Sequence, residues 1–184
     1  MNNNVFIKIL ILVATIVLMQ VITALYGVIL DEITYTISYE YYTKFKFIQF
    51  ELWNYNTDAK FLYPRKYVAA VGILATWWVG LIIGTVLGCI ACINKSYQVM
   101  FKKTYESVLI IFVVILIFGL VGLLVGCFAN PYVKYNYTFT SQIIHEREFF
   151  IVGKINLYTY KGFVFGLFVG VYHQLRTFFS KQIK

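Results

Sequence analysis

The longest apolar run of the chain, residues 67–93, contains no charged side chain. As an α-helix this run would be about 40 Å long, which exceeds the roughly 30 Å hydrocarbon core of a bilayer. Small residues recur in it at every fourth position and would form one stripe along the helix: Gly72, Thr76, Gly80, Gly84 and Gly88. Because small residues let the backbones of two membrane helices approach closely, the pattern predicts a membrane span packed against another helix. Of Trp77 and Trp78, we expect one between helices and one against lipid.

Three further apolar runs predict spans at residues 9–30, 107–129 and 157–178. The first is longer than the apolar region of a signal peptide, so we expect a retained anchor. The third span is expected to end at Asn130-Pro131, because the residue before a proline disfavours the helical conformation. The fourth is free of charge only over 162–175 and needs snorkelling basic residues at both ends. We therefore predict an all-α membrane protein, a four-helix transmembrane bundle in a single domain over residues 1–184.

Two other predicted spans also carry glycine at helical spacing, namely Gly119, Gly122 and Gly126, and Gly162, Gly166 and Gly170. We interpret all three glycine sets as helix-packing faces and expect contacts among the second, third and fourth spans. A small channel or carrier is an alternative, because glycine faces can also clear a path. Such a path normally needs ionisable groups at mid-membrane, and the candidates there, Gln20, Thr23 and Thr76, do not ionise.

Composition and charge support the membrane assignment and suggest an orientation. The chain is 60% apolar and only 13% charged, with a net charge of +8. Its basic residues are scattered beside apolar runs, which favours anionic lipid headgroups over nucleic acid as their partner. The basic residues of the two terminal segments and of the short connector between the second and third spans are Lys8, Lys95, Lys102, Lys103, Arg176, Lys181 and Lys184. The positive-inside rule then places both termini in the cytoplasm and the loops 31–66 and 130–156 outside.

Both outer loops contain alternating patterns that are typical of strands. Apolar and polar residues alternate over 33–40, again over 44–47, and in the second loop over 135–140. We therefore expect short β-like segments, which could pair into a small extracytoplasmic cap over the bundle.

Acidic and histidine side chains gather in these outer loops: Asp31, Glu32, Glu40, His145 and Glu146. Carboxylate and imidazole together suit a divalent metal, so these residues are the candidate metal ligands. The alternative is a salt-bridged, solvated rim, which their irregular spacing favours. Cys89 and Cys92 form a C-x-x-C without a second pair, so we interpret them as small packing residues. No cofactor is predicted, apart from the metal of the first alternative.

Three motifs resemble a group of small bacterial four-span membrane proteins of unknown function. They have the forms D-[QE]-[VI]-T, E-Y-[FY]-T and A-T-W-W-V-G, and here read Asp31-Glu32-Ile33-Thr34, Glu40-Tyr41-Tyr42-Thr43 and Ala75-Thr76-Trp77-Trp78-Val79-Gly80. This chain has Leu30 and Asn156 where the group has histidines. If those histidines bind a metal in the group, this chain has lost that ability. The resemblance implies a bacterial plasma membrane location and supplies no activity.

The sequence thus favours a non-enzymatic structural or interaction protein of the bacterial inner membrane that uses its extracytoplasmic face. Its expected partners are the lipid bilayer and another membrane or periplasmic protein, with a homo-oligomer as a further possibility, and no nucleic acid. A membrane metal-binding protein or enzyme with a site at the outer rim is the second reading, and a channel or carrier the third.

Overall fold

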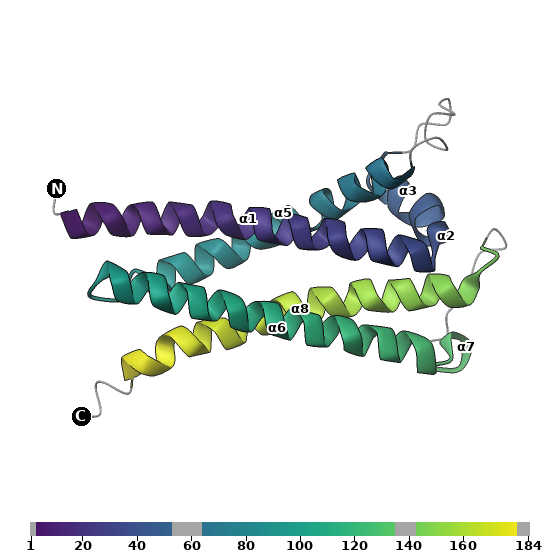
Figure 1. Cartoon of the computed structure of the whole chain (residues 1–184). Coiled ribbons are helices and arrows are strands. Elements are labelled where there is room, and N and C mark those ends of the chain that lie inside the picture. The colour runs from purple at the N-terminus through teal and green to yellow at the C-terminus, as the bar shows by residue number, and fades with distance from the viewer. Residues whose placement is uncertain (1–2, 53–63, 135–142, 180–184) are drawn as a thin grey trace. The chain divides into compact units, whose positions relative to one another are not determined.

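Helices make up all the regular structure in the computed structural model, which describes residues 3–52, 64–134 and 143–179 (Figure 1). Four of them are long: α1 (Asn3–Ile37), α5 (Pro64–Ala91), α6 (Tyr97–Phe128) and α8 (Glu146–Phe179). The short ones are α2 (Tyr39–Tyr41), the π-helical turn η1 (Tyr42–Lys46), α3 (Phe47–Gln49) and α7 (Pro131–Lys134). No strand occurs in the described residues.

Three of the long helices are long and apolar enough to cross a membrane: Asn4–Ile37 of α1, together with α5 and α6. This indicates a membrane protein. The fourth predicted span lies within α8, which is helical throughout but more polar. Several polar side chains of α8 are buried within the protein rather than exposed, among them Lys154, Asn156, Thr159 and Gln174. They lower the hydropathy of α8 without facing outward.

One helix begins and another ends at a proline signal in the sequence. Pro64 opens α5, at the position where proline costs a helix least because its missing N–H has no partner there anyway. α6 ends at Phe128, just before the predicted stop at Asn130-Pro131. Asn130 Oδ1 accepts a hydrogen bond from the backbone N–H of Tyr132 at 3.0 Å and so begins α7. The predicted helix stop is confirmed.

The predicted strands are wrong wherever the structure describes them. Residues 33–37 continue α1, and residues 44–47 lie in η1 and the start of α3. Extending an existing helix adds one hydrogen bond for each residue fixed, so α1 continues through a β-prone stretch that lacks Gly and Pro. Thr36 fits this helix by donating from Oγ1 to the carbonyl of Ile33 at 2.6 Å. The third predicted segment, 135–140, lies outside the described residues.

The chain forms two compact units, and every long helix contributes residues to both. Unit 1 comprises the described residues of Met1–Thr23, Trp77–Ile117 and Tyr160–Lys184. Unit 2 comprises those of Ala24–Thr76 and Phe118–Thr159.

In unit 1 the glycine stripe of α5 packs against α1. A Cβ built on Gly84 would lie 2.8 Å from Ile16 Cα, and one on Gly80 would lie 2.7 Å from Gln20 Cα. The stripe therefore faces the first span, whereas the sequence led us to expect the third and fourth. The glycines of α8 face α6 instead: a Cβ on Gly170 would lie 2.9 Å from the Ile111 side chain.

Unit 2 repeats both contacts with other glycines. Gly72 of α5 meets the backbone of Gly27 on α1, where a Cβ would lie 2.6 Å from the Gly27 carbonyl carbon. Gly122 and Gly126 of α6 meet the backbone of α8 at Lys154 and Ile151, with corresponding distances of 2.7 and 2.9 Å. In the helix pairs α1–α5 and α6–α8, the backbones can thus approach closely because glycine has no side chain at the contact. Among the other predicted packing residues, Thr76 and Gly162 are buried.

The burial pattern of the A-T-W-W-V-G motif follows the helical repeat. Ala75, Thr76, Val79 and Gly80 are buried, whereas Trp77 and Trp78 are both exposed. Because a helix turns every 3.6 residues, pairs of buried and exposed positions alternate along it. The expectation that one tryptophan packs between helices is wrong.

Candidate functional site

A buried polar cluster lies in unit 2, where α1 ends and the chain enters the short helices. We call residues 38–49, which hold α2, η1 and α3, the 38–49 segment. Ser38 has an extended backbone conformation (φ −142°, ψ 100°) that ends α1, and its Oγ accepts the backbone N–H of Tyr41 at 3.3 Å. This serine cap starts α2 and aims the next side chains inward.

Apolar packing holds the 38–49 segment in place. Tyr41, Tyr42 and Phe47 are buried in one hydrophobic cluster with residues of α5 and α8, namely Val68, Val71, Phe149 and Val152. Their rings meet edge to face, for example Tyr41 and Phe149 with centroids 5.1 Å apart. This apolar packing fixes the segment that carries Glu40.

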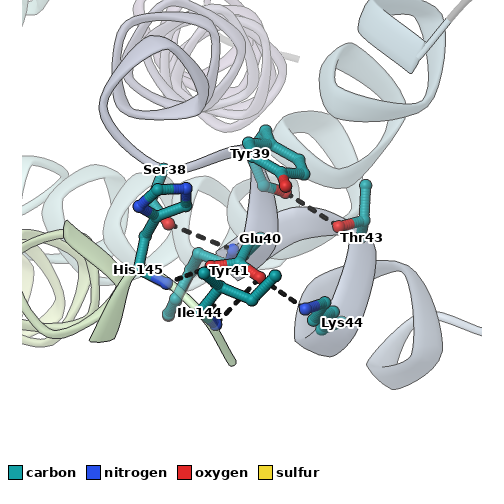
Figure 2. A network of polar contacts seen from close by, with 8 residues as sticks. All are labelled: Ser38, Tyr39, Glu40, Tyr41, Thr43, Lys44, Ile144 and His145. Carbon is teal, nitrogen blue, oxygen red and sulfur yellow. Dashed lines mark hydrogen bonds and ion pairs between the residues drawn. The ribbon is translucent and has the colours of Figure 1, made fainter. Parts of the chain in front are cut away.

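Glu40 is the centre of the cluster and is fully buried, with 0% of its surface exposed. Figure 2 shows its carboxylate facing the start of α8, where the backbone N–H of His145 donates to Oε2 at 2.6 Å. The N–H of Ile144 lies 3.2 Å from both carboxylate oxygens, and Lys44 Nζ donates to Oε1. All these donors come from segments far apart in sequence except Lys44, one helical turn away.

The protonation state of Glu40 follows from these bonds. Burial by itself opposes ionisation, but the hydrogen bonds from Lys44 and from the amides of His145 and Ile144 outweigh it and hold the pKa of Glu40 below its usual value. Glu40 is therefore ionised at neutral pH. With both oxygens already accepting hydrogen bonds, it is suited to fastening the segment to α8 rather than to acting as a base.

Asp31, Thr34 and Tyr42 form a second part of the cluster. The Tyr42 hydroxyl hydrogen-bonds to the Asp31 carboxylate and lies 2.6 Å from Thr34 Oγ1. Burial and the neighbouring Asp31 charge raise the pKa of Tyr42, so it stays protonated. Thr34 Oγ1 also donates to the carbonyl of Leu30 at 2.9 Å, so the one proton of each hydroxyl is shared among these partners. The other oxygen of Asp31, Oδ2, has no hydrogen-bond partner among the described residues, although Asp31 is only 3% exposed.

Lys46 places a positive charge beside this carboxylate. Its ammonium lies 5.9 Å from the ring centroids of both Tyr41 and Phe45, and 5.6 Å from that of Phe50. Burial lowers the pKa of Lys46, and the charge of Asp31 opposes this shift. Aromatic faces compensate the ammonium for lost water, as in other cation–π contacts.

The five predicted ligands occupy separate environments. Glu40 and Asp31 are buried as described, while Glu32 is on the surface, paired with Arg65 at 2.6 Å. His145 meets Glu40 through its backbone N–H, and its exposed ring contacts Tyr39. Glu146 lies in the first turn of α8. Within the described residues, no three His, Cys, Asp or Glu side chains form a group that could hold a metal ion.

Sequence reasoning missed Lys46 and the role of Tyr42. When residues 44–47 are considered as a strand, Lys46 shares a face with Lys44 and would be solvated. In a helix, Tyr42 and Lys46 stand four residues apart on one side, which points both toward the same neighbours. That helical spacing is the signal that could have identified them.

Unit 1 has its own polar contacts, which join helix ends. The Glu106 carboxylate of α6 accepts from His173 Nε2 of α8 at 3.0 Å, and Ser107 donates to the carbonyl of Gly170 at 3.2 Å. Lys8 of α1 donates to the carbonyl of Asn94 in the α5–α6 connector. His173 thus has an acidic partner on the neighbouring helix.

No protein-family model matches the chain, and neither a curated protein nor a solved structure matches it. The resemblance to small bacterial four-span proteins therefore stays a prediction that rests on the three motifs. The structure adds that Asp31 and Thr34 of the first motif and Glu40 and Tyr42 of the second are all buried, and that Tyr42 contacts both residues of the first.

Proposed function

We propose that the chain is a four-span helical protein of the bacterial inner membrane that works as a structural or interaction protein through its extracytoplasmic face. In this proposal α8 is the fourth member of a transmembrane bundle, and the 38–49 segment belongs to a small outer cap. Both termini lie in the cytoplasm. The protein acts by presenting a surface to another membrane or periplasmic protein, and not by catalysis.

The observation that carries this proposal is the buried carboxylate of Glu40. Taking a charge out of water costs several kcal/mol unless hydrogen bonds compensate for it. Here the donors are two backbone amides before α8 and Lys44, so the charge fixes the 38–49 segment to the residues that begin α8. A surface fixed in advance binds a partner with a smaller loss of conformational entropy. An interaction role therefore explains why a charge is buried at this point.

Site-specific photo-cross-linking tests the proposal. A photoreactive amino acid at Ile144, which is 74% exposed beside the Glu40 bonds, should give a discrete protein adduct in intact cells. The matched control is Leu120 of α6, which is 61% exposed on an apolar helix and should react with lipid alone. Glu40→Gln should weaken the Ile144 adduct. The proposal is wrong if Ile144 gives no protein adduct, or the same one as Leu120.

A metal-binding or enzymatic protein is the second candidate. The observation that favours it is Asp31 Oδ2, which is buried and lacks a hydrogen-bond partner among the described residues. Elemental analysis of the purified protein decides between the two. A stoichiometric divalent metal that disappears in Asp31→Ala would support this candidate, and a metal-free protein would remove it.

A further inference from the structure

A groove of about 570 Å³ lies in unit 2 between the end of α6 and the start of α8. One wall consists of residues 128–132, which hold the last residue of α6 and the first residues of α7, and the other wall consists of residues 144–148. Arg147 joins the two walls, because its guanidinium donates to two backbone carbonyls where α6 ends. The amide bonds to Glu40 fix the second wall in addition. The shape of this groove is therefore set by contacts within the protein.

Apolar side chains line the groove and stay exposed. Phe128 is 84% and Tyr132 53% exposed on one wall, and Ile144 is 74% exposed on the other. Large apolar side chains that are exposed together beside polar ones are typical of a surface that another molecule covers. The volume falls within the range of about 300–1,000 Å³ that is usual for ligand pockets, so the groove has room for a few side chains of a bound segment.

The charge that the groove offers to an occupant is negative. Its charged residues, among the described part of the lining, are Glu146, Arg147 and Glu148. Arg147 is already engaged by carbonyls at the negative end of the α6 dipole. Neither glutamate forms an ion pair with a described residue, and both are partly buried. The positive end of the α8 dipole, about half a charge, offsets only part of their two negative charges. A cation is therefore the complementary occupant.

A protein side chain fits this groove better than a lipid headgroup does. The amine of a zwitterionic headgroup carries a phosphate beside it, which two carboxylates would repel, and an anionic headgroup brings no cation. A lysine or arginine side chain brings a cation alone. Apolar neighbours in the same segment would cover Phe128 and Ile144, which a bare cation would leave exposed.

We propose that this groove binds a basic segment of an extracytoplasmic partner protein, with a lysine or arginine at Glu146 and Glu148 and an apolar side chain against Phe128 and Ile144. The inference rests on the interaction function proposed above, because it names what the partner presents to the outer face.

Binding of a defined peptide to the purified full-length chain in neutral detergent tests this assignment. The probe is a fluorescent five-residue peptide in which lysine and leucine alternate, and its uncharged counterpart has glutamine in place of each lysine. Fluorescence anisotropy should show half-maximal binding of the lysine peptide at a concentration about tenfold lower. Added salt should reduce this preference, because it screens charges in an open groove. Equal binding of the two peptides would overturn the proposal.

Variants of the lining residues test whether the preference arises in the groove. The double variant Glu146→Gln, Glu148→Gln should abolish it. Glu32→Gln is the matched control, because it removes a partly exposed carboxylate of unit 2 that Arg65 already pairs, and it should keep the preference. If the double variant does not fold, exposed Ile144 decides: Ile144→Lys should bind the lysine peptide about tenfold more weakly than Ile144→Gln. An unchanged preference in the double variant, or equal binding by the two Ile144 variants, would contradict the proposal.

Two further measurements separate this inference from its alternatives. Phosphatidylethanolamine added to the detergent should not displace the lysine peptide, and full displacement would assign the groove to a lipid amine and overturn the protein assignment. In cells, a protein adduct at Ile144 that persists in the double variant would keep the interaction function and overturn the basic segment. The absence of any protein adduct at Ile144 would instead remove the interaction function, and this inference with it.

Discussion

At the scale of single residues, Glu40 shows how the fold gives a candidate side chain partners that the sequence does not indicate. The sequence marked it as a possible metal ligand because it is acidic and lies in an outer loop. The structure places it at 0% exposure, bonded to the backbone before α8. Its neighbours in the first candidate set, Glu32 and His145, do not join it through their side chains. Residue type made Glu40 a candidate, while its partners came only from the fold.

Replacement of Glu40 with glutamine should destabilise the protein. Glutamine keeps the shape but loses the charge, so the bonds from the Ile144 and His145 amides become neutral and Lys44 loses its ion pair. We expect a loss of about 1.5–3 kcal/mol in the free energy of unfolding. Unfolding of the purified protein in mixed micelles with rising dodecyl sulfate would measure it. Glu32→Gln, which breaks the partly exposed pair with Arg65, is the control and should cost less than about 1 kcal/mol. Equal losses would contradict the assigned role.

The same bonds predict a pH dependence. Hydrogen bonds lower the pKa of Glu40 in the folded state, so the folded protein binds this proton less tightly than the unfolded chain. The stabilisation is therefore fully present above the unfolded carboxyl pKa, about 4.3, and is lost as the pH falls through the lower folded value. The stability difference between wild type and Glu40→Gln should shrink between about pH 5 and pH 3. A difference that stays constant over this interval would show that the charge is not responsible.

At the scale of elements, the glycine faces were predictable but their partners were not. Periodicity alone showed that Gly72, Gly80 and Gly84 lie on one side of a helix. It could not say which helix they meet, because any second apolar helix satisfies the same pattern. The structure pairs this stripe with α1, and the α6 glycines with α8.

Two alanine variants separate close packing from helix propensity. A Cβ on Gly72 would meet only backbone atoms of Gly27 and Val28, at 2.6 to 2.7 Å, so no side-chain rotation can relieve it. Gly72→Ala should cost about 1–3 kcal/mol. A Cβ on Gly119 would find its nearest atom at 3.6 Å, so Gly119→Ala should be neutral or stabilising by up to about 1 kcal/mol. Both would be measured by unfolding in mixed micelles. Similar losses in the two variants would contradict the packing assignment.

Arg147 connects two elements at their ends. Its guanidinium donates to the carbonyl of Ala129 at 2.7 Å and to that of Cys127, which satisfies acceptors left open where α6 ends. Arg147→Ala should lower stability by about 1 kcal/mol. Hydrogen exchange should rise at the last turn of α6 and stay unchanged in the middle of that helix. A uniform rise along α6 would count against a capping role.

At the scale of the whole molecule, the open question is the proposed four-span topology. Composition identifies three candidate spans, and α8 falls outside them because its polar side chains lower its hydropathy, although several of them are buried in the protein. Four spans place both termini on one side of the membrane. Three spans would place them on opposite sides.

Cysteine labelling of intact cells distinguishes these topologies. In a background without Cys89, Cys92 and Cys127, a membrane-impermeant maleimide should label Ile144→Cys directly. Lys95→Cys and Arg176→Cys should react only after the membrane is permeabilised, because the proposal puts both on the cytoplasmic side. Labelling of Arg176→Cys in intact cells would show that α8 does not cross the membrane.

The sequence by itself determined the membrane character, the long helices and the glycine faces. Each of these follows from local properties: in lipid a chain must satisfy its backbone hydrogen bonds within the segment, and helical periodicity sets which residues share a face. Only the tertiary structure decided that residues 33–37 continue α1, that the α5 stripe meets α1, and that Glu40 bonds to an amide 104 positions away. These outcomes depend on contacts between distant segments, whose energies no local pattern records.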